Sequence, residues 1–251
     1  MVQLSESKFQ ALSEEHQHRI CCKLLRRVFE EEDKSALQTY LNVCDWLRLE
    51  PLNKESRERV ADRFHWHLRQ SGRGLSEANL LQSAQQKDRT QPVSDPLSVH
   101  VYLDRLRSAH NVGSILRTMD AFRLGTVFFS SGMCSAAHPQ VQQTSMGTYE
   151  WVPSVTLDAS SELPEPLVAL ETDHHRGISL YDFVFPQQCT IVLGNEETGC
   201  SRNILQHAVS TIYIPMHGRK NSLNVANAFA VVASEVRRQY DFKQQRNLSN
   251  G

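Results

Sequence analysis

The sequence predicts two domains of different class: a small all-α domain, then an α/β domain with a mostly parallel sheet. Apolar residues follow helical spacing before about residue 90, whereas short strand-like apolar runs alternate with helical ones after residue 98. The stretch between them is polar and contains two prolines. We therefore divide the 251 residues into a helical domain at 1–90, a linker at 91–97, an α/β domain at 98–240 and a polar tail at 241–251.

Four helices are predicted in the first domain. Ser13 marks the start of the first, Pro51 follows the second, and the Ser71-Gly72 turn ends the third. Their apolar positions, in chain order, are Ile20, Leu24, Leu25 and Val28; Leu37, Tyr40, Leu41, Cys44 and Leu47; Val60, Phe64 and Leu68; and Leu80, Leu81 and Ala84. The third helix is dense in arginine, at positions Arg57, Arg59, Arg63, Arg69 and Arg73. RNA contact and a solvated face paired with nearby acids explain these arginines equally well.

Six strands are predicted in the second domain. They are expected at 99–103, 126–129, 151–155, 167–170, 190–193 and 211–214, with helices at 111–124 and 222–238 among those between and after them. This alternation of strands and helices is typical of a parallel α/β sheet.

Charge is balanced along the chain, with 27 Lys and Arg against 28 Asp and Glu. This balance argues against broad, non-specific nucleic-acid binding, so any RNA site is a local patch. The start has no signal-like apolar core, and no later run approaches the ~18 residues of a membrane span. We therefore expect a soluble cytoplasmic protein. The six cysteines form no CxxC pair, which favours reduced, mostly buried thiols.

Two strand-to-helix turns between residues 190 and 236 indicate a ligand pocket. The first follows Leu193 with Gly194, and Glu196 lies between that glycine and Gly199. The second passes from Ile214 through a glycine turn to a small-residue helix that opens at 222–224. A strand that ends in glycine lets a ligand approach the backbone, and a helix start offers free N–H groups.

Three motifs in this domain resemble those of the SpoU-type RNA 2′-O-methyltransferases of the SPOUT superfamily, enzymes that use S-adenosylmethionine (SAM). The motifs are SAHNVGSILRTMDAF at 108–122, Gly194-Asn195-Glu196 with Gly199, and Ser222-Leu223-Asn224-Val225. They occur in the right order, and the resemblance covers about 98–240. It implies a C-terminal trefoil knot, which periodicity alone does not reveal.

The resemblance also implies roles for five polar residues. Arg117 would act on the target ribose and Asn111 would orient the active site, while Glu196, Ser222 and Asn224 match further active-site positions. We favour phosphate anchoring for Arg117, because a guanidinium normally stays protonated and is an awkward base. The proton acceptor is left open.

Each of these residues also has an ordinary structural explanation. Asn111 is a candidate cap of an amphipathic helix, with Arg117 paired to Asp120 on its surface. Glu196 would be a solvated loop acid, and Ser222 a helix N-cap. Without the other motifs, the amphipathic helix is the stronger interpretation of 108–122.

No GxGxxG follows the first strand, so the usual dinucleotide-binding fingerprint is absent. The resemblance implies that backbone groups of the knotted loops hold the methyl donor. The resemblance places it at Gly194, Ile214 and Leu223, with Met216 and Gly218 as neighbours. Four cations flank the motifs, and their closeness to two of them favours contact with RNA phosphates over solvated charges; they are Arg105, Arg107, Arg219 and Lys220.

No metal is expected. Asp173, His174 and His175 are consecutive, and three consecutive residues do not easily converge on one ion. We interpret them as a polar turn.

These observations predict a SAM-dependent methyltransferase acting on a ribose 2′-hydroxyl of structured RNA, with tRNA slightly favoured over rRNA. The alternatives are a catalytically silent RNA-binding relative and an α/β protein that binds a different nucleotide. Superfamily sites are built at a dimer interface, so we also expect a homodimer. The helical domain is expected to help recognise RNA.

Overall fold

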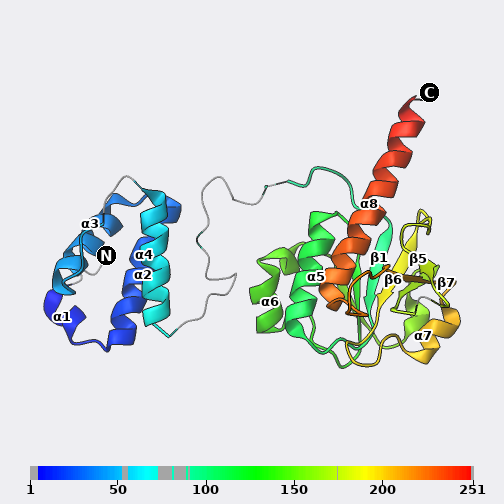
Figure 1. Cartoon of the computed structure of the whole chain (residues 1–251), viewed down its shortest axis with the longest axis horizontal. Helices are drawn as coiled ribbons and strands as arrows, with labels where there is room; N and C mark the ends of the chain where they lie inside the picture. The colour runs from blue at the N-terminus through cyan, green and yellow to red at the C-terminus, as the bar shows by residue number, and fades with distance from the viewer. Residues whose placement is uncertain are drawn as a thin grey trace. The chain divides into compact units, whose positions relative to one another are not determined.

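The chain divides into two compact units, residues 1–91 and residues 92–251 (Figure 1). The structure is a computed structural model and describes residues 5–52, 56–72, 81, 89, 91–173 and 175–249. The fourth predicted helix, apart from Leu81, lies outside these described residues.

Four helices form the described part of the first unit: α1 (Glu6–Gln10), α2 (Glu14–Glu31), α3 (Lys34–Trp46) and α4 (Arg57–Gln70). Side chains cap the last three, because Ser13, Asp33 and Ser56 each accept a backbone N–H from the first helical turn. The five-residue α1 was not predicted, since so short a segment shows no periodicity. It nevertheless places the fully buried Phe9 in the core of this unit.

A chain of polar side chains runs through that core. The Tyr40 hydroxyl lies 2.8 Å from His67 Nε2, and His67 Nδ1 lies 2.7 Å from His18 Nδ1. His67 is fully buried. Burial, and then the neighbouring His18 and Arg63, lower the pKa of His67 to about 3. The imidazole of His67 is therefore neutral at pH 7.

The arginines of α4 differ in their surroundings. Arg57 stacks on Phe29 at 4.4 Å and donates to the Phe29 carbonyl at 3.0 Å. Arg63 donates to the Glu50 carbonyl at 3.2 Å. Arg59 and Arg69 are exposed, and Arg73 lies outside the described residues. Part of this basic helix therefore serves the fold of its own unit.

The second unit contains a seven-stranded sheet in the order β3-β2-β1-β6-β4-β7-β5, with every neighbouring pair parallel. The strands are β1 (Val99–Leu103), β2 (Val127–Ser130), β3 (Ser154–Leu157), β4 (Leu167–Leu170), β5 (Ile178–Ser179), β6 (Cys189–Leu193) and β7 (Ser210–Tyr213). The helices are α5 (Ala109–Ala121), α6 (Pro139–Ser145), α7 (Arg202–His207) and α8 (Val225–Ser249), with two 3₁₀ turns, η3 (Thr148–Glu150) and η4 (Ser160–Glu162). The mostly parallel sheet is confirmed.

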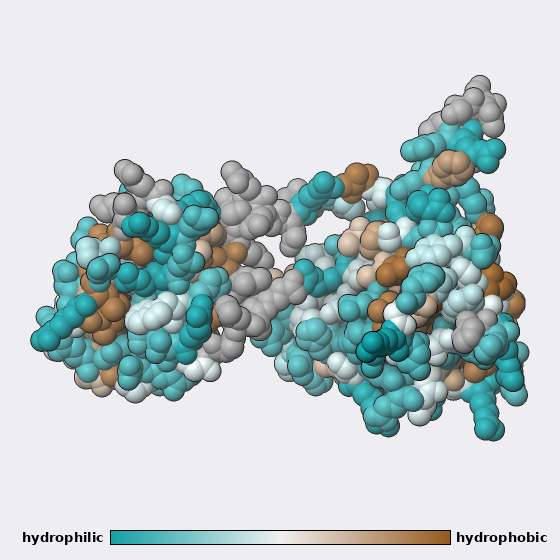
Figure 2. All heavy atoms as spheres, in the orientation of Figure 1, coloured by the Kyte–Doolittle hydropathy of each residue, from teal (hydrophilic) through white to brown (hydrophobic). Residues whose placement is uncertain are grey.

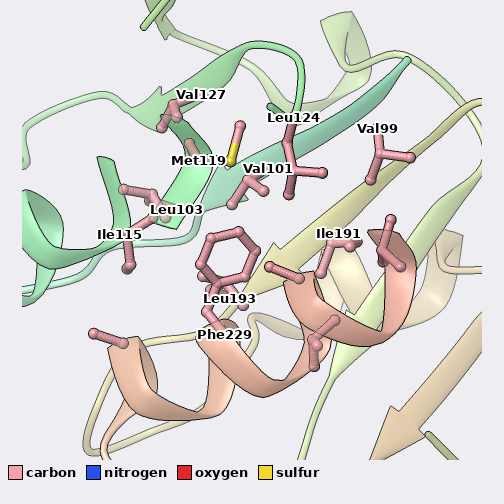
Figure 3. Close-up of a cluster of buried hydrophobic side chains, with 14 of the residues drawn as sticks. Val99, Val101, Leu103, Ile115, Met119, Leu124, Val127, Ile191, Leu193 and Phe229 are labelled. Carbon is pink, nitrogen blue, oxygen red and sulfur yellow. The ribbon is translucent and has the colours of Figure 1, made fainter. Parts of the chain in front are cut away.

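Alternating residues of the central strands build a core on each face of the sheet. Val101 and Ile191 point to one face, where they pack with α5 and α8 (Figure 3). Tyr102 and Val192 belong to the other cluster, which contains Ile204 of α7. Helices therefore cover both faces of the sheet, and its carboxyl edge is left for the loops.

Several predicted boundaries are corrected. The strand expected at 151–155 begins only at Ser154, because the Trp151 and Val152 N–H groups both donate to the Thr148 carbonyl in a turn. Helix α8 begins at Val225 and not at Ser222. Residues 241–249, predicted as a polar tail, continue α8, where Asp241 pairs with Arg237 at 2.9 Å. The short β5 and α6 were not predicted.

Hydrophilic side chains cover most of the visible face of each unit, with smaller hydrophobic patches between them (Figure 2). Within the described ranges, no helix is both long and apolar enough to cross a membrane.

The buried His67 makes the stability of the helical unit pH-dependent. Because its folded pKa lies below the ordinary 6.5, the unfolded chain binds a proton first as the pH falls. Stability is therefore lost below about pH 6.5, by at most ~1.4 kcal/mol per pH unit. Scanning calorimetry at about pH 7.5 and about pH 5 measures this loss, which we expect to be smaller for His67→Gln than for the wild type.

The control is His16→Gln, at an exposed position in the first turn of α2. This variant is expected to lose as much stability as the wild type. An equal loss in all three proteins contradicts the prediction.

Candidate active site

A cavity of about 530 Å³ lies at the carboxyl edge of the sheet, beside the ends of β4, β6 and β7. Ligands of open parallel sheets typically bind at such an edge, where neighbouring loops diverge. The lining residues are Leu170, Glu171, Thr172, Leu193, Gly194, Asn195, Glu196, Glu197, Thr198, Gly199, Ile214, Met216, Asn221, Ser222, Leu223, Asn224, Val225 and Ala228. Both turns that the sequence indicated therefore line one cavity.

The first turn folds back tightly onto Gly194. A Cβ atom at this position would lie 2.2 Å from the backbone nitrogen of Cys200 and 2.2 Å from the carbonyl carbon of Gly199. Asn195 holds the same turn, because its side-chain oxygen accepts the N–H groups of Glu197 and Thr198 at 3.0 and 3.2 Å. Only glycine fits at residue 194, so the cavity has a backbone wall there.

The Glu196 carboxylate connects this turn to the first motif. Its Oε2 accepts the backbone N–H of Arg107 at 3.0 Å, and its Oε1 accepts the Ser108 N–H at 3.2 Å. The Asn111 amide also donates to Oε1, at 2.9 Å. Three donors around the start of α5 therefore hold one carboxylate that comes from the end of β6.

These donors determine the charge of Glu196. Partial burial acts to raise its pKa, but the hydrogen bonds from the Arg107 N–H, the Asn111 amide and the Ser108 N–H lower it below the usual range. Glu196 is therefore an anion and a weak proton acceptor at neutral pH. Its geometry suits positioning better than proton transfer.

Asn111 extends the network to the third motif. Its side-chain oxygen accepts the Asn224 amide at 3.0 Å. Asn224 in turn caps α8, because its side-chain oxygen accepts the N–H groups of Ala226 and Asn227 at 3.0 and 3.3 Å. Glu196, Asn111 and Asn224 thus form one continuous chain of hydrogen bonds.

Two capping interpretations of the sequence are corrected by these contacts. Ser108 caps α5, accepting the Asn111 N–H at 3.2 Å, so the Asn111 side chain is free to bridge Glu196 and Asn224. Asn224 caps α8 where Ser222 was the candidate. Ser222 lies two residues before that cap and lines the cavity.

The residues predicted to hold the donor fall into two groups. Gly194, Ile214, Met216 and Leu223 line the cavity. Gly218 is not among the lining residues, and an added Cβ there meets no atom within 4 Å.

The predicted cations lie around the cavity and not in its wall. Arg105 and Arg107 are exposed and line a second, smaller hollow of about 280 Å³. Arg219 and Lys220 are exposed in the loop before α8. Arg117 is half-buried on α5, six residues or ~9 Å along the helix from Asn111, and does not line the cavity.

Sequence reasoning missed two acids that shape the site. Glu171 follows β4 and accepts the Cys200 N–H at 2.6 Å. Asp104 follows β1, is almost fully buried, and accepts the Ser201 N–H at 2.6 Å. Both acids stand directly after a predicted strand. Ligand sites of parallel sheets lie at the carboxyl ends of the strands, so this position could have identified both acids.

Burial, and then the Glu171 carboxylate, raise the pKa of the Cys200 thiol, so it is not a thiolate nucleophile at neutral pH. Among the described residues, no three His, Cys, Asp or Glu side chains are grouped to hold a metal ion. His174 lies outside those residues.

Comparison with known protein families agrees with the three motifs. Residues 98–234, more than half of the chain, match the SpoU rRNA Methylase family. The chain belongs to this family. The match spans the whole sheet and both turns that line the cavity.

Two curated relatives show the range of the family. The chain is 30% identical over 149 residues to the 23S rRNA (uridine(2479)-2′-O)-methyltransferase of Streptomyces viridochromogenes, covering 55% of this chain and 52% of that protein. It is 28% identical over 232 residues to the 23S rRNA (guanosine-2′-O-)-methyltransferase RlmB of Neisseria meningitidis serogroup B, covering 88% and 84%. The chain thus spans about half the length of the first relative.

A solved structure shares the fold of the second unit. The SpoU methyltransferase AviRb of Streptomyces viridochromogenes, in complex with AdoMet (SAM), matches with a TM-score of 0.52 and 28% identity, over 59% of this chain and 62% of that one.

The contacts of Gly194 generate a stability prediction. Gly194→Ala forces a methyl group against the backbone of residues 199–200 and is expected to lower the free energy of unfolding of this unit by about 2 kcal/mol or more. Gly218→Ala is the matched control, because its methyl group meets open space. Thermal melting followed by circular dichroism measures both, and equal melting temperatures contradict the described turn.

Proposed function

We propose that this protein transfers a methyl group from SAM to a ribose 2′-hydroxyl of structured RNA. The observation that carries the proposal is the hydrogen-bonded chain of Glu196, Asn111 and Asn224 beside the cavity. It joins one polar residue from each of the three motifs of a SpoU family chain. The Streptomyces and Neisseria relatives bear the names of ribose 2′-O-methyltransferases.

The cavity fits SAM. Its volume falls within the ~300–1,000 Å³ usual for cofactor sites. Gly194 provides bare backbone on one side, and Leu193, Ile214 and Leu223 provide apolar surface for an adenine ring. We assign the donor to the backbone of Gly194, Ile214 and Leu223, with Met216 as a neighbour. When bound, SAM supplies a methyl group on a positively charged sulfur.

On the substrate side, the residues of the network position rather than exchange protons. The Glu196 carboxylate, whose pKa is lowered by its hydrogen bonds, holds the start of α5 beside the cavity. The hydrogen bond between Asn111 and Asn224 connects this network to the start of α8. Ser222 lies at the rim, within reach of a bound ribose. Arg117 anchors the phosphate next to the target ribose through two parallel N–H groups.

Four exposed cations near the site are suited to RNA phosphates, which would compete with the pairing of Arg105 to Asp104 and of Arg107 to Glu197. Arg105 and Arg107 line the small hollow next to the Glu196 turn, and Arg219 and Lys220 are exposed before α8. Phosphate contacts fix register without reading sequence. We assign these four cations to the RNA backbone and a further part of recognition to the helical unit. The substrate class implies a cytoplasmic site of action.

We also propose that two chains associate through the second unit and that the segment after β6 threads a trefoil knot. Arg117 does not line the cavity of its own chain. A second copy of the chain that adds polar groups to the cavity would complete the site. On α8, the core takes Ala226, Phe229 and Val232, while Val225, Ala228 and Val231 are half-buried. These half-buried residues are suited to partner contact.

The alternative of a catalytically silent relative is disfavoured by the side chains present. Arg117, Asn111, Glu196, Ser222 and Asn224 are all retained, and three of them are locked in one network. Binding of a different nucleotide is disfavoured by the family match.

The proposed donor generates a binding prediction. Isothermal calorimetry of the full chain is expected to show binding of SAM and of its demethylated product in the presence of a metal chelator. Incubation with labelled SAM and total RNA is expected to place the label in 2′-O-methylated nucleosides, and mapping then decides between tRNA and rRNA. Folded protein that binds neither compound refutes the enzyme.

Arg117 allows a test of phosphate anchoring. Arg117→Ala is expected to reduce methyl transfer by ~100-fold or more with SAM affinity nearly unchanged, because misplacement at a reacting centre has that effect. Arg117→Lys keeps the charge but loses the planar pair of donors, so it is expected to remain impaired. Single-turnover rates measure both. If Arg117→Ala transfers methyl groups at a near-normal rate, Arg117 is not part of the site. If Arg117→Lys recovers most of the rate, the paired hydrogen bonds to phosphate are not needed.

The proposed homodimer is tested by light scattering. We expect twice the chain mass at micromolar concentration, since a site completed by a partner needs a stable pair. An active monomer contradicts the proposal.

A further inference from the structure

The helical unit has a hollow of its own, of about 400 Å³, which we name the α2–α4 pocket. It is lined by Glu14, Gln17, His18, Leu47, Leu49 and Trp66. These residues come from α2, from the turn after α3, and from α4. All of them belong to residues 1–91, so the pocket is separate from the cavity in the second unit. None of the assignments made above uses it.

His18 presents a hydrogen-bonding group in this pocket. Its Nδ1 is engaged by His67, whose Nε2 faces the Tyr40 hydroxyl. We assign the Tyr40 hydroxyl as the donor to His67 Nε2, because a hydroxyl donates one proton and the Arg63 guanidinium beside it accepts none. Neutral His67 then carries its proton on Nδ1 and donates to His18.

The same reasoning places the proton of His18 on Nε2. Within the described part of the chain, this nitrogen has no hydrogen-bond partner. His18 is only 5% exposed as a residue, but its Nε2 is not among the buried polar atoms without a partner, so this nitrogen meets solvent at the pocket it lines. The pocket therefore contains a fixed donor for a ligand that carries an acceptor.

Trp66 provides a fixed aromatic surface. Its ring packs edge-on against two imidazoles, with centroid distances of 5.3 Å to His18 and 4.7 Å to His67. The side chain is nevertheless 38% exposed. Base stacking on aromatic side chains accounts for much of the affinity of proteins for unpaired RNA. Together with the apolar Leu47 and Leu49, Trp66 suits a flat heteroaromatic ring.

The polar rim supplies acceptors. Gln17 donates its amide N–H groups to the carbonyls of Phe9 and Leu12 at 3.2 and 3.1 Å, which leaves its side-chain oxygen as an acceptor. Glu14 adds a carboxylate. A carboxylate repels phosphate but accepts paired N–H groups. The pocket thus favours a base over the RNA backbone.

Two exposed arginines are close in sequence to lining residues of the pocket. Arg48 stands between Leu47 and Leu49 in a left-handed turn, and it is exposed. Arg69 is exposed one helical turn after Trp66. A base in the pocket would carry its neighbouring phosphates toward these charges.

Guanine matches the set of donors and acceptors best among the four bases. Its pairing edge has two adjacent N–H donors, which suit the Glu14 carboxylate, and one carbonyl acceptor, which suits His18 Nε2. We propose that the α2–α4 pocket binds one unstacked guanine base of the RNA substrate. This inference rests on the proposed function insofar as the ligand is RNA, and it adds a sequence preference supplied by the helical unit.

The test uses the full chain and three fluorescent RNA heptamers: UUUGUUU, UUUAUUU and UUUUUUU. Anisotropy titrations are expected to show about tenfold tighter binding of the guanine heptamer, the size of one good hydrogen-bonded pair. Glu14→Gln is expected to abolish this preference. Glu15→Gln is the matched control, because Glu15 lies in the same helical turn, carries the same charge and pairs with Arg19 outside the pocket.

Trp66→Ala is expected to weaken binding of all three heptamers by about 5-fold or more, because stacking does not depend on the base. If this variant fails to fold, the comparison of Glu14→Gln with Glu15→Gln still decides, since both positions are at the helix surface. Equal guanine preference in those two variants, or no preference in the wild type, overturns the proposal. If the pocket instead binds a segment of a protein, the wild type is expected to show no guanine preference.

Methyl transfer from labelled SAM to total RNA, measured on the same preparations, separates the two claims. Transfer by the wild type without any guanine preference overturns the pocket and leaves the proposed function in place. Guanine preference that depends on Glu14, in a protein that transfers no methyl group, supports the pocket and refutes the proposed function.

Discussion

One carboxylate holds the site together. Glu196 leaves the end of β6 and accepts the N–H groups of Arg107 and Ser108 at the start of α5. Because it also accepts the Asn111 amide, it fixes the side chain that in turn holds Asn224 at the start of α8. In the sequence, Glu196 lies 85 residues after Asn111, and Asn224 lies 113 residues after Asn111. Charge-assisted hydrogen bonds are stronger than neutral ones, so the anion is the natural centre of the network.

The network depends on the order of the strands. β1 and β6 are neighbours in register, with Leu103 opposite Leu193, so the loops that follow them emerge side by side. β4 lies on the other side of β6 and brings Glu171 to the Cys200 N–H. The bare backbone at Gly194 lets these loops approach closely. The same parallel pairing that buries both faces of the sheet therefore creates the cavity at its edge.

The sequence predicted most of this fold because its signals are local. Helical and strand periodicity located six of the seven strands and the main helices, while the two-residue β5 and the short α1 are below the length at which periodicity shows. The strand order, with β4 between β6 and β7, depends on distant pairing and was not predictable. In the site, the motifs singled out Asn111, Glu196 and Asn224, which the structure joins in one network, whereas the alternative that Asn111 caps α5 is wrong. Asn111 is drawn away from capping by a carboxylate 85 residues later, and no local pattern reports such a contact.

The central claim is that the anionic Glu196 organises the proposed catalytic site. Its most direct test compares methyl transfer by Glu196→Gln and Glu197→Gln under single-turnover conditions with saturating SAM. Glu197 is the adjacent acid and also lines the cavity, but it is exposed and its ion pair with Arg107, at 2.8 Å, is at the surface, so losing its charge is expected to change the rate far less than losing that of Glu196. Glu196→Gln keeps the shape of the side chain but turns an N–H group toward other donors, and the account predicts a loss of ~100-fold or more. A rate for Glu196→Gln within a few-fold of that for Glu197→Gln would contradict it.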